Sequence, residues 1–314
     1  MIIVIGATGF VGRYLVDRLV RDGFNVLATG RSKAGEEFYN EKGIPFTRLD
    51  ITNEEDFKDL PKNGIDAVIH LASLIPAAVK EHNAKDYLSV NAIGTYNVLE
   101  YCRRNNINRL IYTSSHFDVQ GLWGSNVPIK SDAPRMIKYK GNHTLYIISK
   151  ITSMDFIEHY YQEYGLSTII FRLAGVYGYG RYESAFELFV RQASAGAPIE
   201  IWGDPSPVRD GIYIKDVVSA IRKAITNSKV TGLYNLASGK GISLEDRIKD
   251  IIKVFCPKNK SSEIVYRPEI PNGIRSYVYD ISETKKALEW EPQYSYEAML
   301  EDYKLEMERQ YFEI

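Results

Sequence analysis

The sequence predicts an α/β protein, with a doubly wound parallel sheet and a smaller, discontinuous α/β lobe beside it. Apolar runs of strand length alternate with helix-periodic segments through the first half of the 314-residue chain. That alternation indicates parallel strands joined by crossover helices. In the second half Gly and Pro crowd residues 175–184 and 195–211. This composition indicates loops and short strands that fold over the sheet edge.

The individual elements follow from apolar runs and periodicity. In the first helix Val11, Leu15 and Leu19 repeat at four-residue steps, and Gly23 follows as a left-handed cap. The elements expected in the first half are strands at 2–5, 25–29, 45–49, 67–71, 109–113 and 168–171, and helices near 10–21, 54–60, 85–105 and 145–164.

Capping signals add further helix starts. Thr52 and Glu55 stand at capping-box spacing before the second helix, and Ser243 and Ser282 announce two later helices. The expected division is 1–172 with a return segment near 211–240 for the sheet domain, and 173–210 with 241–314 for the lobe.

Composition excludes several classes of protein. A formal net charge of -1, with 45% apolar and 25% charged residues, gives no basic surface for nucleic acid or membrane. Two cysteines and five scattered histidines indicate neither a disulfide framework nor a metal site. The N-terminal "MIIVIGATGFVG" lacks a leading positive segment, and its apolar run is short. We therefore expect a cytoplasmic protein without a signal peptide.

The turn after the first strand carries Gly6, Gly9 and Gly12 directly before an amphipathic helix. Their spacing is G-x-x-G-x-x-G rather than the commoner G-x-G-x-x-G. Backbone amides at a helix start can approach a pyrophosphate only where side chains are absent. The context therefore predicts a Rossmann-type dinucleotide site, and the alternative is a tight turn that serves helix packing alone.

The end of the second strand bears on the choice of dinucleotide. Gly30 stands where an acid usually receives the adenosine ribose, and Arg31 follows it. An arginine binds a ribose phosphate that an acid would repel, so the expectation is NAD or NADP with a lean towards NADP. Arg31 could equally be a solvated loop residue or stack on adenine. Asp50, after the third strand, could accept from the adenine amino group or cap the next helix.

Tyr146 and Lys150 lie one helical turn apart in "YIISK". With 23 tyrosines and 21 lysines in the chain, about 1.5 such pairs are expected by chance, and one is found. The pair therefore takes its meaning from the motifs around it.

Those motifs occur in a fixed order: "GATGFVG", "HLAS", "NAIGTYNVLEYCRRNNINRLIYTSS", "YIISK", "FRLAGVYG" and "RDGIYIKDVV". In this order the chain resembles the extended short-chain dehydrogenase/reductases over nearly its whole length. It is most similar to their NAD(P)-dependent nucleotide-sugar epimerase/dehydratase branch, in particular the UDP-glucose and UDP-N-acetylglucosamine 4-epimerases.

The resemblance implies catalytic roles. Tyr146 would take a hydroxyl proton while the adjacent carbon gives hydride to the cofactor, and Lys150 would hold the nicotinamide ribose and favour the phenolate. Ser115 would steady the developing charge, with Ser114 the runner-up. The family more often has Ser-Ser-x-x-Val-Tyr-Gly here, whereas this chain has an inserted residue and Gln120 in place of the tyrosine.

Other positions would contact the cofactor or support the site. His70 and Asn91 are implied to be structural, and a lone histidine after an apolar run is more often a core residue. The remaining residues implied to contact the dinucleotide are Phe10, Ile51, Leu71, Ala72 and Ser73.

The resemblance also implies a nucleotide-sugar site in the lobe. Arg209 would bind the substrate diphosphate, Arg275 would be a second arginine there, and Arg267 competes for that role. The main chain at Ile201 and Trp202 would flank the base. Gly175 replaces an asparagine that many relatives use to bind substrate.

Several functions share this scaffold. A 4-epimerase is the first hypothesis, and an NADPH-dependent 4-ketosugar reductase is close behind. Dehydration is disfavoured, because "TSSHF" lacks the Asp-Glu pair that follows the catalytic threonine of 4,6-dehydratases. A non-catalytic dinucleotide-binding module is the remote alternative.

A homodimer is expected through the helices at 85–105 and 145–164.

Overall fold

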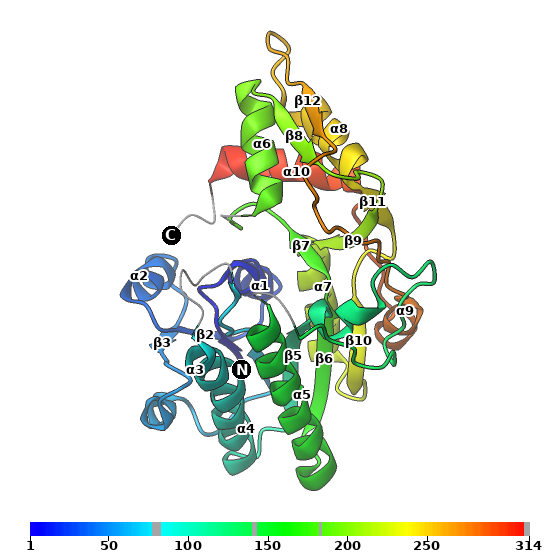
Figure 1. The fold of residues 1–314 in the computed structure, drawn as a ribbon. Coiled ribbons are helices and arrows are strands. Elements are labelled where there is room, and N and C mark those ends of the chain that lie inside the picture. Colours follow the sequence, from blue (N-terminus) through cyan, green and yellow to red (C-terminus); the bar gives the residue numbers. More distant parts are fainter. Residues whose placement is uncertain (77–82, 140–142, 182–183, 311–314) are drawn as a thin grey trace.

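The computed structural model describes residues 1–76, 83–139, 143–181 and 184–310. Its main sheet has seven parallel strands in the order β10-β6-β5-β4-β1-β2-β3 (Figure 1). The predicted doubly wound α/β fold is confirmed. The strands of this sheet are β1 (Ile2–Ile5), β2 (Val26–Gly30), β3 (Phe46–Arg48), β4 (Ala67–His70), β5 (Arg109–Ser115), β6 (Ser167–Leu173) and β10 (Gly232–Leu236).

Helices cover both faces of this sheet. Successive residues of each buried strand point to opposite sides, so both faces carry side chains that must be buried. Ile2 and Val4 join a core with α1 and α7, whereas Ile3 and Ile5 join a second core with α4 and α5. The helices are α1 (Phe10–Arg21), α2 (Lys33–Glu41), α3 (Ala84–Tyr87), α4 (Gly94–Arg104), α5 (Thr144–Tyr164), α7 (Ile214–Thr226) and α9 (Ser282–Leu288).

The lobe is built from chain segments that leave the main sheet after β6 and again after β10. It contains a three-stranded sheet in the order β11-β9-β7 and a parallel pair β12-β8. Figure 1 shows α6, α8 and α10 around these strands. Their bounds are β7 (Gly175–Tyr177), β8 (Ile199–Trp202), β9 (Val208–Tyr213), β11 (Gly241–Ser243), β12 (Ile264–Arg267), α6 (Ala185–Ala195), α8 (Leu244–Phe255) and α10 (Tyr296–Arg309).

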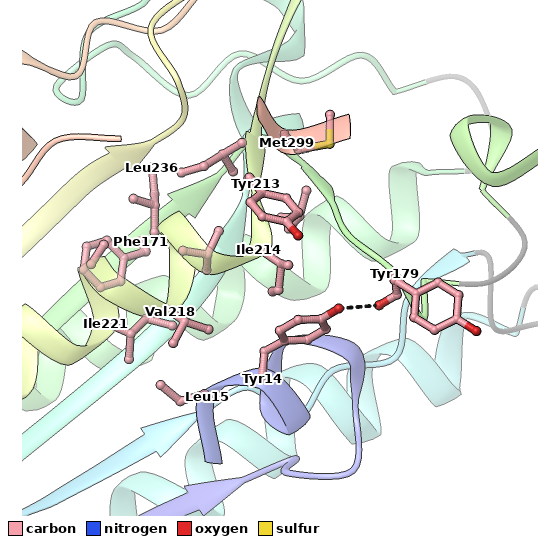
Figure 2. Packing of buried hydrophobic residues seen from close by; sticks show 14 of the residues in the cluster. Tyr14, Leu15, Phe171, Tyr179, Tyr213, Ile214, Val218, Ile221, Leu236 and Met299 are labelled. Carbon is pink, nitrogen blue, oxygen red and sulfur yellow. Dashed lines mark hydrogen bonds between the residues drawn. The ribbon is translucent and has the colours of Figure 1, made fainter. Parts of the chain in front are cut away.

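One hydrophobic core runs from the sheet into the lobe. In Figure 2, Tyr14 of α1 lies beneath Tyr213 and Ile214, and Met299 of α10 closes the cluster above them. The Tyr14 hydroxyl donates to the carbonyl oxygen of Tyr179, 3.0 Å away. Helix α1 is therefore attached to the segment that follows β7 in the lobe.

Several elements differ from the sequence-based expectation. Helix α2 and strand β10 were not predicted. The segment η1 (Glu54–Asp59) is a 3₁₀ helix capped by Asn53, whose side chain accepts from the Glu55 amide. Thr52 is not the cap, because its amide and hydroxyl both donate to Asp50. The helix expected at 85–105 is interrupted by a π-helical segment, η3 (Leu88–Ile93).

Two capping predictions are confirmed. Gly23 has φ +82° just past α1, and the Ser243 hydroxyl accepts from the amide of Asp246 at the start of α8. In the part of the chain that the structure describes, no helix is both long enough and apolar enough to cross a bilayer.

Candidate active site

The glycine loop lies between β1 and α1, where the strand order reverses. Gly6 has φ +87°, and a Cβ there would lie 2.6 Å from the amide nitrogen of Ala72. A Cβ on Gly12 would lie 2.3 Å from the carbonyl oxygen of Gly6. Packing therefore requires glycine at both positions. Among described atoms, a Cβ on Gly9 would meet only the Gly6 carbonyl oxygen within 4 Å, at 3.3 Å, so the face of Gly9 is open.

This open face lies beside the N-terminus of α1. The first turn of α1 has no capping side chain and no acidic residue, so its amides and the positive end of the helix dipole are available to an anion. The cradle fits the pyrophosphate of a dinucleotide. Phe10 closes one side, because its ring packs on Tyr14 with centroids 5.8 Å apart and lies 2.8 Å from where a Cβ on Gly178 would be.

The loop after β4 lies against the glycine loop. The amides of Leu71 and Ala72 donate to the carbonyl oxygen of Ile5 at 2.9 and 3.1 Å. Ser73 Oγ donates to Asn91 Oδ1 at 3.0 Å, and Asn91 Nδ2 donates to Ser149 Oγ at 2.9 Å. Asn91 thus joins this loop to α5, which supports the structural role expected for it.

Asn91 reaches both partners from the π-helical segment η3. Such segments widen one turn of a helix and often occur at functional sites. Here the carbonyl oxygen of Asn91 accepts from Ser153 Oγ at 2.7 Å and from Thr95 Oγ1 at 2.5 Å. Side-chain hydroxyls therefore take over backbone pairing at the irregular turn.

Tyr146 and Lys150 extend from α5 towards the end of β5, and both are buried. Lys150 Nζ donates to the carbonyl oxygen of Thr113 at 2.8 Å and lies 4.2 Å from the centre of the Tyr112 ring. Strand β5 is longer than expected, so Ser114 and Ser115 lie within it rather than after it.

The two serines differ in what surrounds them. Burial raises the pKa of the Tyr146 phenol, and the nearby Ser115 side chain opposes that rise. Ser114 Oγ is buried and has no hydrogen-bond partner among the described residues. The geometry therefore places Ser115, the first choice from the sequence, beside Tyr146.

Burial controls the protonation of this cluster. Burial raises the pKa of Tyr146 above 10, while the Ser115 side chain and the charge of Arg181 oppose this rise. Burial also lowers the pKa of Lys150 to about 7. The sequence-based argument that the ammonium favours the phenolate is thus outweighed by desolvation in the protein alone.

His70 is a core residue rather than a free base. Its Nε2 lies 3.0 Å from Thr95 Oγ1, and the side chain is fully buried. Burial lowers its pKa to about 3, with a smaller contribution from the charge of Lys150. His70 is therefore neutral near pH 7, as the structural interpretation requires.

The residues expected at the adenosine end lie on the other side of β1. Arg31 is exposed, directly before Ser32, whose side chain caps α2 by accepting from Gly35. Asp50 Oδ1 accepts from the amide and the hydroxyl of Thr52 at 2.9 and 2.8 Å. Ile51 is buried, and its carbonyl oxygen accepts from Asn97 Nδ2 at 2.9 Å.

A cavity of about 290 Å³ lies in the lobe, between helices α6 and α8 and strands β7 and β9. Gly175 and Arg209 line it, as do two arginines that the sequence reasoning missed, Arg181 and Arg247. The described lining contains no Asp or Glu. Three guanidinium groups without a carboxylate indicate a site for an anion.

Three expected substrate residues are not among those that line this cavity. Ile201 is fully buried in the core, and Trp202 is half exposed, with its indole nitrogen donating to Glu200. Arg275 is exposed. Arg267, the alternative to Arg275 as the second arginine, forms an ion pair with Glu200 at 3.1 Å.

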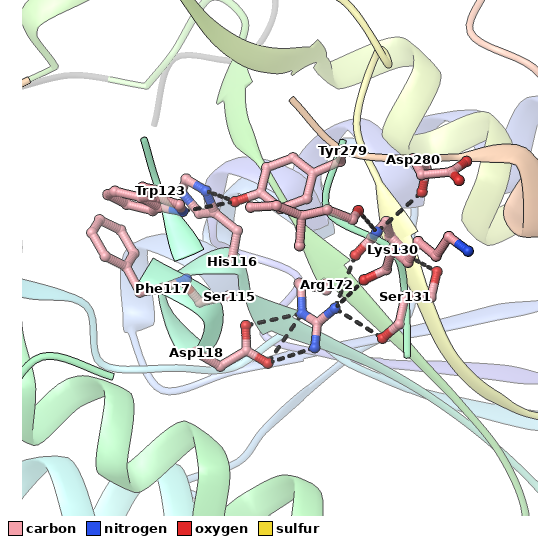
Figure 3. A network of polar contacts seen from close by, with 12 residues as sticks. Ser115, His116, Phe117, Asp118, Trp123, Lys130, Ser131, Arg172, Tyr279 and Asp280 are labelled. Carbon is pink, nitrogen blue, oxygen red and sulfur yellow. Dashed lines mark hydrogen bonds and ion pairs between the residues drawn. The ribbon is translucent and has the colours of Figure 1, made fainter. Parts of the chain in front are cut away.

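Between the two sites lies a buried network, which Figure 3 shows. Arg172, at the end of β6, donates from Nε to both carboxylate oxygens of Asp118 at 2.9 and 3.0 Å. Next to it His116 Nδ1 lies 3.0 Å from the Tyr279 hydroxyl. Burial and three nearby arginines lower the pKa of His116 to about 3.

An aromatic wall connects Tyr146 to the cavity. Phe117 packs against the cluster that holds Tyr146, and its ring centre lies 5.2 Å from that of Trp123. Trp123 in turn lies 4.6 Å from Tyr277, which lines the cavity. Packed aromatic side chains therefore join the cluster around Tyr146 to the lining of the arginine cavity.

Comparison with known proteins identifies the family to which this chain belongs. A profile of the NAD dependent epimerase/dehydratase family matches residues 2–237. The chain belongs to this family. The predicted membership of the extended short-chain dehydrogenase/reductases is thereby confirmed.

Relatives of this epimerase/dehydratase include both reaction types. A UDP-glucuronate 4-epimerase from Thermodesulfobacterium geofontis is 27% identical over 310 residues, covering 94% of this chain and 92% of the relative. A dTDP-glucose 4,6-dehydratase from Haemophilus influenzae is 24% identical over 322 residues and 94% of each chain.

A solved structure agrees in fold. The UDP-glucose 4-epimerase of Thermotoga maritima, crystallised with UDP-glucose, has a TM-score of 0.84 and 25% identity, with 98% of this chain and 99% of that chain covered. The protein is thus an NAD-dependent enzyme of the nucleotide-sugar epimerase/dehydratase type, and its cofactor is a nicotinamide dinucleotide.

Proposed function

We propose that this enzyme epimerises a nucleotide sugar, a UDP-hexose or UDP-N-acetylhexosamine, at carbon 4. One observation carries the proposal. Three arginines line a lobe cavity whose described lining has no Asp or Glu, and packed aromatic rings join this cavity to the cluster that holds Tyr146. A ligand anchored by its diphosphate in the cavity would therefore present its sugar to Tyr146 and Ser115.

The residues divide the chemistry among them. The bound dinucleotide supplies a hydride acceptor and a positive charge. Tyr146 takes the proton of the sugar hydroxyl, and Ser115 donates a hydrogen bond to the same oxygen. Lys150, which donates to the Thr113 carbonyl oxygen, would hold the nicotinamide ribose of the bound dinucleotide. Gly6, Gly9 and Gly12 bring the backbone to the pyrophosphate, with Leu71, Ala72 and Ser73 alongside.

Epimerisation is favoured over dehydration by the residues after Ser115. A 4,6-dehydratase needs an added acid and base there, but His116 and Phe117 occupy these positions. His116 is neutral, because burial lowers its pKa to about 3. Asp118 is engaged by Arg172 in a buried ion pair. The chain therefore offers no free acid at this point.

A 4-ketosugar reductase that uses NADPH is the second candidate, and Arg31 is the observation that favours it. Arg31 is exposed beside the N-terminus of α2, where a ribose phosphate would meet both its charge and the helix amides. Replacing Arg31 with Ala should weaken NADPH binding more than NADH binding. Equal losses of affinity for NADPH and NADH would mean that Arg31 gives no preference for NADPH.

The deciding experiment examines the purified protein with UDP- and dTDP-sugars. We expect retained NAD, formation of a product isomer and no net NADH in the absorbance spectrum. A protein that binds NADPH and oxidises it only with a 4-ketosugar would instead be a reductase.

Tyr146→Phe separates catalysis from binding alone. Loss of the base should lower turnover by about 10²- to 10⁴-fold, while dinucleotide binding stays intact. Unchanged turnover would contradict the role of Tyr146. Absence of turnover in the unmodified protein with every sugar would favour the binding module.

We further propose a cytoplasmic homodimer that pairs the helices at 85–105 and 145–164. Exposed apolar residues support it: Ile93 and Tyr96 lie at the start of the α4 region, and Tyr164 ends α5. Light scattering should give twice the chain mass, and a monomer would contradict the proposal.

A further inference from the structure

Arg247 lies in the first turn of α8, and no motif in the sequence points to it. The side chain is partly buried and lines the lobe cavity together with Arg209. One terminal nitrogen donates to the carbonyl oxygen of Arg209 and the other to the Tyr177 hydroxyl. The guanidinium carbon lies 5.3 Å from the centre of the Tyr177 ring. These contacts hold Arg247 beside Arg209.

Donor groups in this cavity lack acceptors. Arg209 Nε, Arg247 Nε and the Tyr296 hydroxyl are buried without a hydrogen-bond partner in the described part of the protein, and all three residues line the cavity. Buried donors normally have partners, and a charged group left without one carries a large desolvation penalty. Three such groups on residues that line one cavity indicate that a ligand supplies the acceptors.

The charges in the cavity are also unbalanced. Arg209 and Arg247 take part in none of the ion pairs between described residues. Asp210 follows Arg209 but does not neutralise it, because its carboxylate accepts from the Ser238 and Gly239 amides and from the Tyr279 amide. A ligand with two adjacent negative groups would match two adjacent guanidinium groups.

The two arginines expected to assist Arg209 do not have this environment. Arg267 and its partner Glu200 are both nearly half exposed, and Arg275 is exposed outside the cavity lining. We infer that Arg247, rather than Arg275 or Arg267, is the second arginine of the diphosphate site. This inference rests on the proposed nucleotide-sugar function, and it makes Arg247 a determinant of substrate affinity.

Calorimetric titration with UDP, UMP and uridine tests the assignment. Arg247→Met should weaken UDP binding by about 10- to 100-fold, weaken UMP binding less and leave uridine unchanged. Arg267→Met and Arg275→Met should stay within about twofold of the unmodified protein, like the exposed control Arg21→Met on α1. Tyr296→Phe, which removes one hydroxyl, should weaken UDP binding by a smaller factor.

Two results would overturn the assignment: UDP binding that Arg247→Met leaves unchanged, or an equal loss for UDP and uridine. If Arg247→Met does not fold, Arg247→Lys keeps the charge and loses the fork. It should then show intermediate UDP affinity, and unmodified affinity would also overturn the inference. A failure of the proposed function looks different, since the unmodified protein would then bind no nucleoside diphosphate.

Discussion

Arg172 and Arg209 lie near one another in the fold but differ in what balances their charge. The side chain of Arg172 is fully buried against Asp118, with side-chain exposures of 0% and 1%, and it also donates to Ser131 and Asn235. Arg209 contacts the Tyr277 ring at 5.8 Å, and its Nε has no described partner. The fold supplies the partners of the first arginine, whereas under the proposed function a bound ligand would supply those of the second.

The largest expected effect comes from breaking the completed pair. Asp118→Asn leaves the Arg172 guanidinium buried without a countercharge, so the free energy of unfolding should fall by about 3–5 kcal/mol. Urea denaturation measures this. Arg209→Met is the matched comparison and should change stability by less than about 0.5 kcal/mol. Equal effects in the two variants would abolish the distinction.

The order of the two variants should be reversed for ligand binding, where Arg209→Met should have the larger effect. Arg209→Met should weaken UDP binding by about 10- to 100-fold, because a charge-assisted hydrogen bond contributes about 1.5–3 kcal/mol. Calorimetric titration measures this, with the exposed Arg21→Met as the control. UDP affinity unchanged in Arg209→Met would place the anion elsewhere.

Lys150 is a third buried cation, and it faces the Thr113 carbonyl, the Tyr112 ring and His70 rather than a carboxylate. Its pKa is lowered from 10.5 to about 7, so between these values the unfolded chain binds more protons than the folded one. The free energy of unfolding should therefore rise with pH in this window, by at most about 1.4 kcal/mol per pH unit.

Lys150→Met removes that contribution. Urea denaturation at pH 7 and pH 9 should show a smaller rise for the variant than for the unmodified protein. An identical pH dependence would mean that Lys150 is not desolvated as the structure indicates.

The smallest expected effect concerns salt. Raising the salt concentration from 0.05 to 0.5 M should weaken UDP binding several-fold, because the cavity charges act on a ligand that arrives through solvent. The buried pair of Arg172 and Asp118 is screened much less, so stability should change little over the same range. UDP affinity independent of salt would contradict an electrostatic role for the cavity.

Features encoded by neighbouring residues were predictable from the sequence. The glycine loop, the Tyr146 and Lys150 spacing and the parallel strands depend on local patterns, and the structure contains all three elements. The role of His70 as a core residue followed from its place after an apolar run.

Features that depend on tertiary contacts were not predictable. Helix α2 contains Gly35 and is held by Tyr39, whose hydroxyl donates to the Ala7 carbonyl at 2.6 Å. The π-helical segment depends on Asn91 bonds to residues far along the chain. Arg247 was missed because folding alone brings it beside Arg209, 38 positions earlier.

The order of strands in the sheet also shapes how the chain emerges from the ribosome. β6 pairs with β5 on one side, but its other neighbour, β10, is synthesised only after residues 174–231 of the chain. At about 5–20 residues per second, the outer edge of β6 stays unpaired for several seconds. An unpaired edge can accept a foreign strand. Nascent chains that have reached β6 but not β10 should therefore be the form most dependent on chaperones.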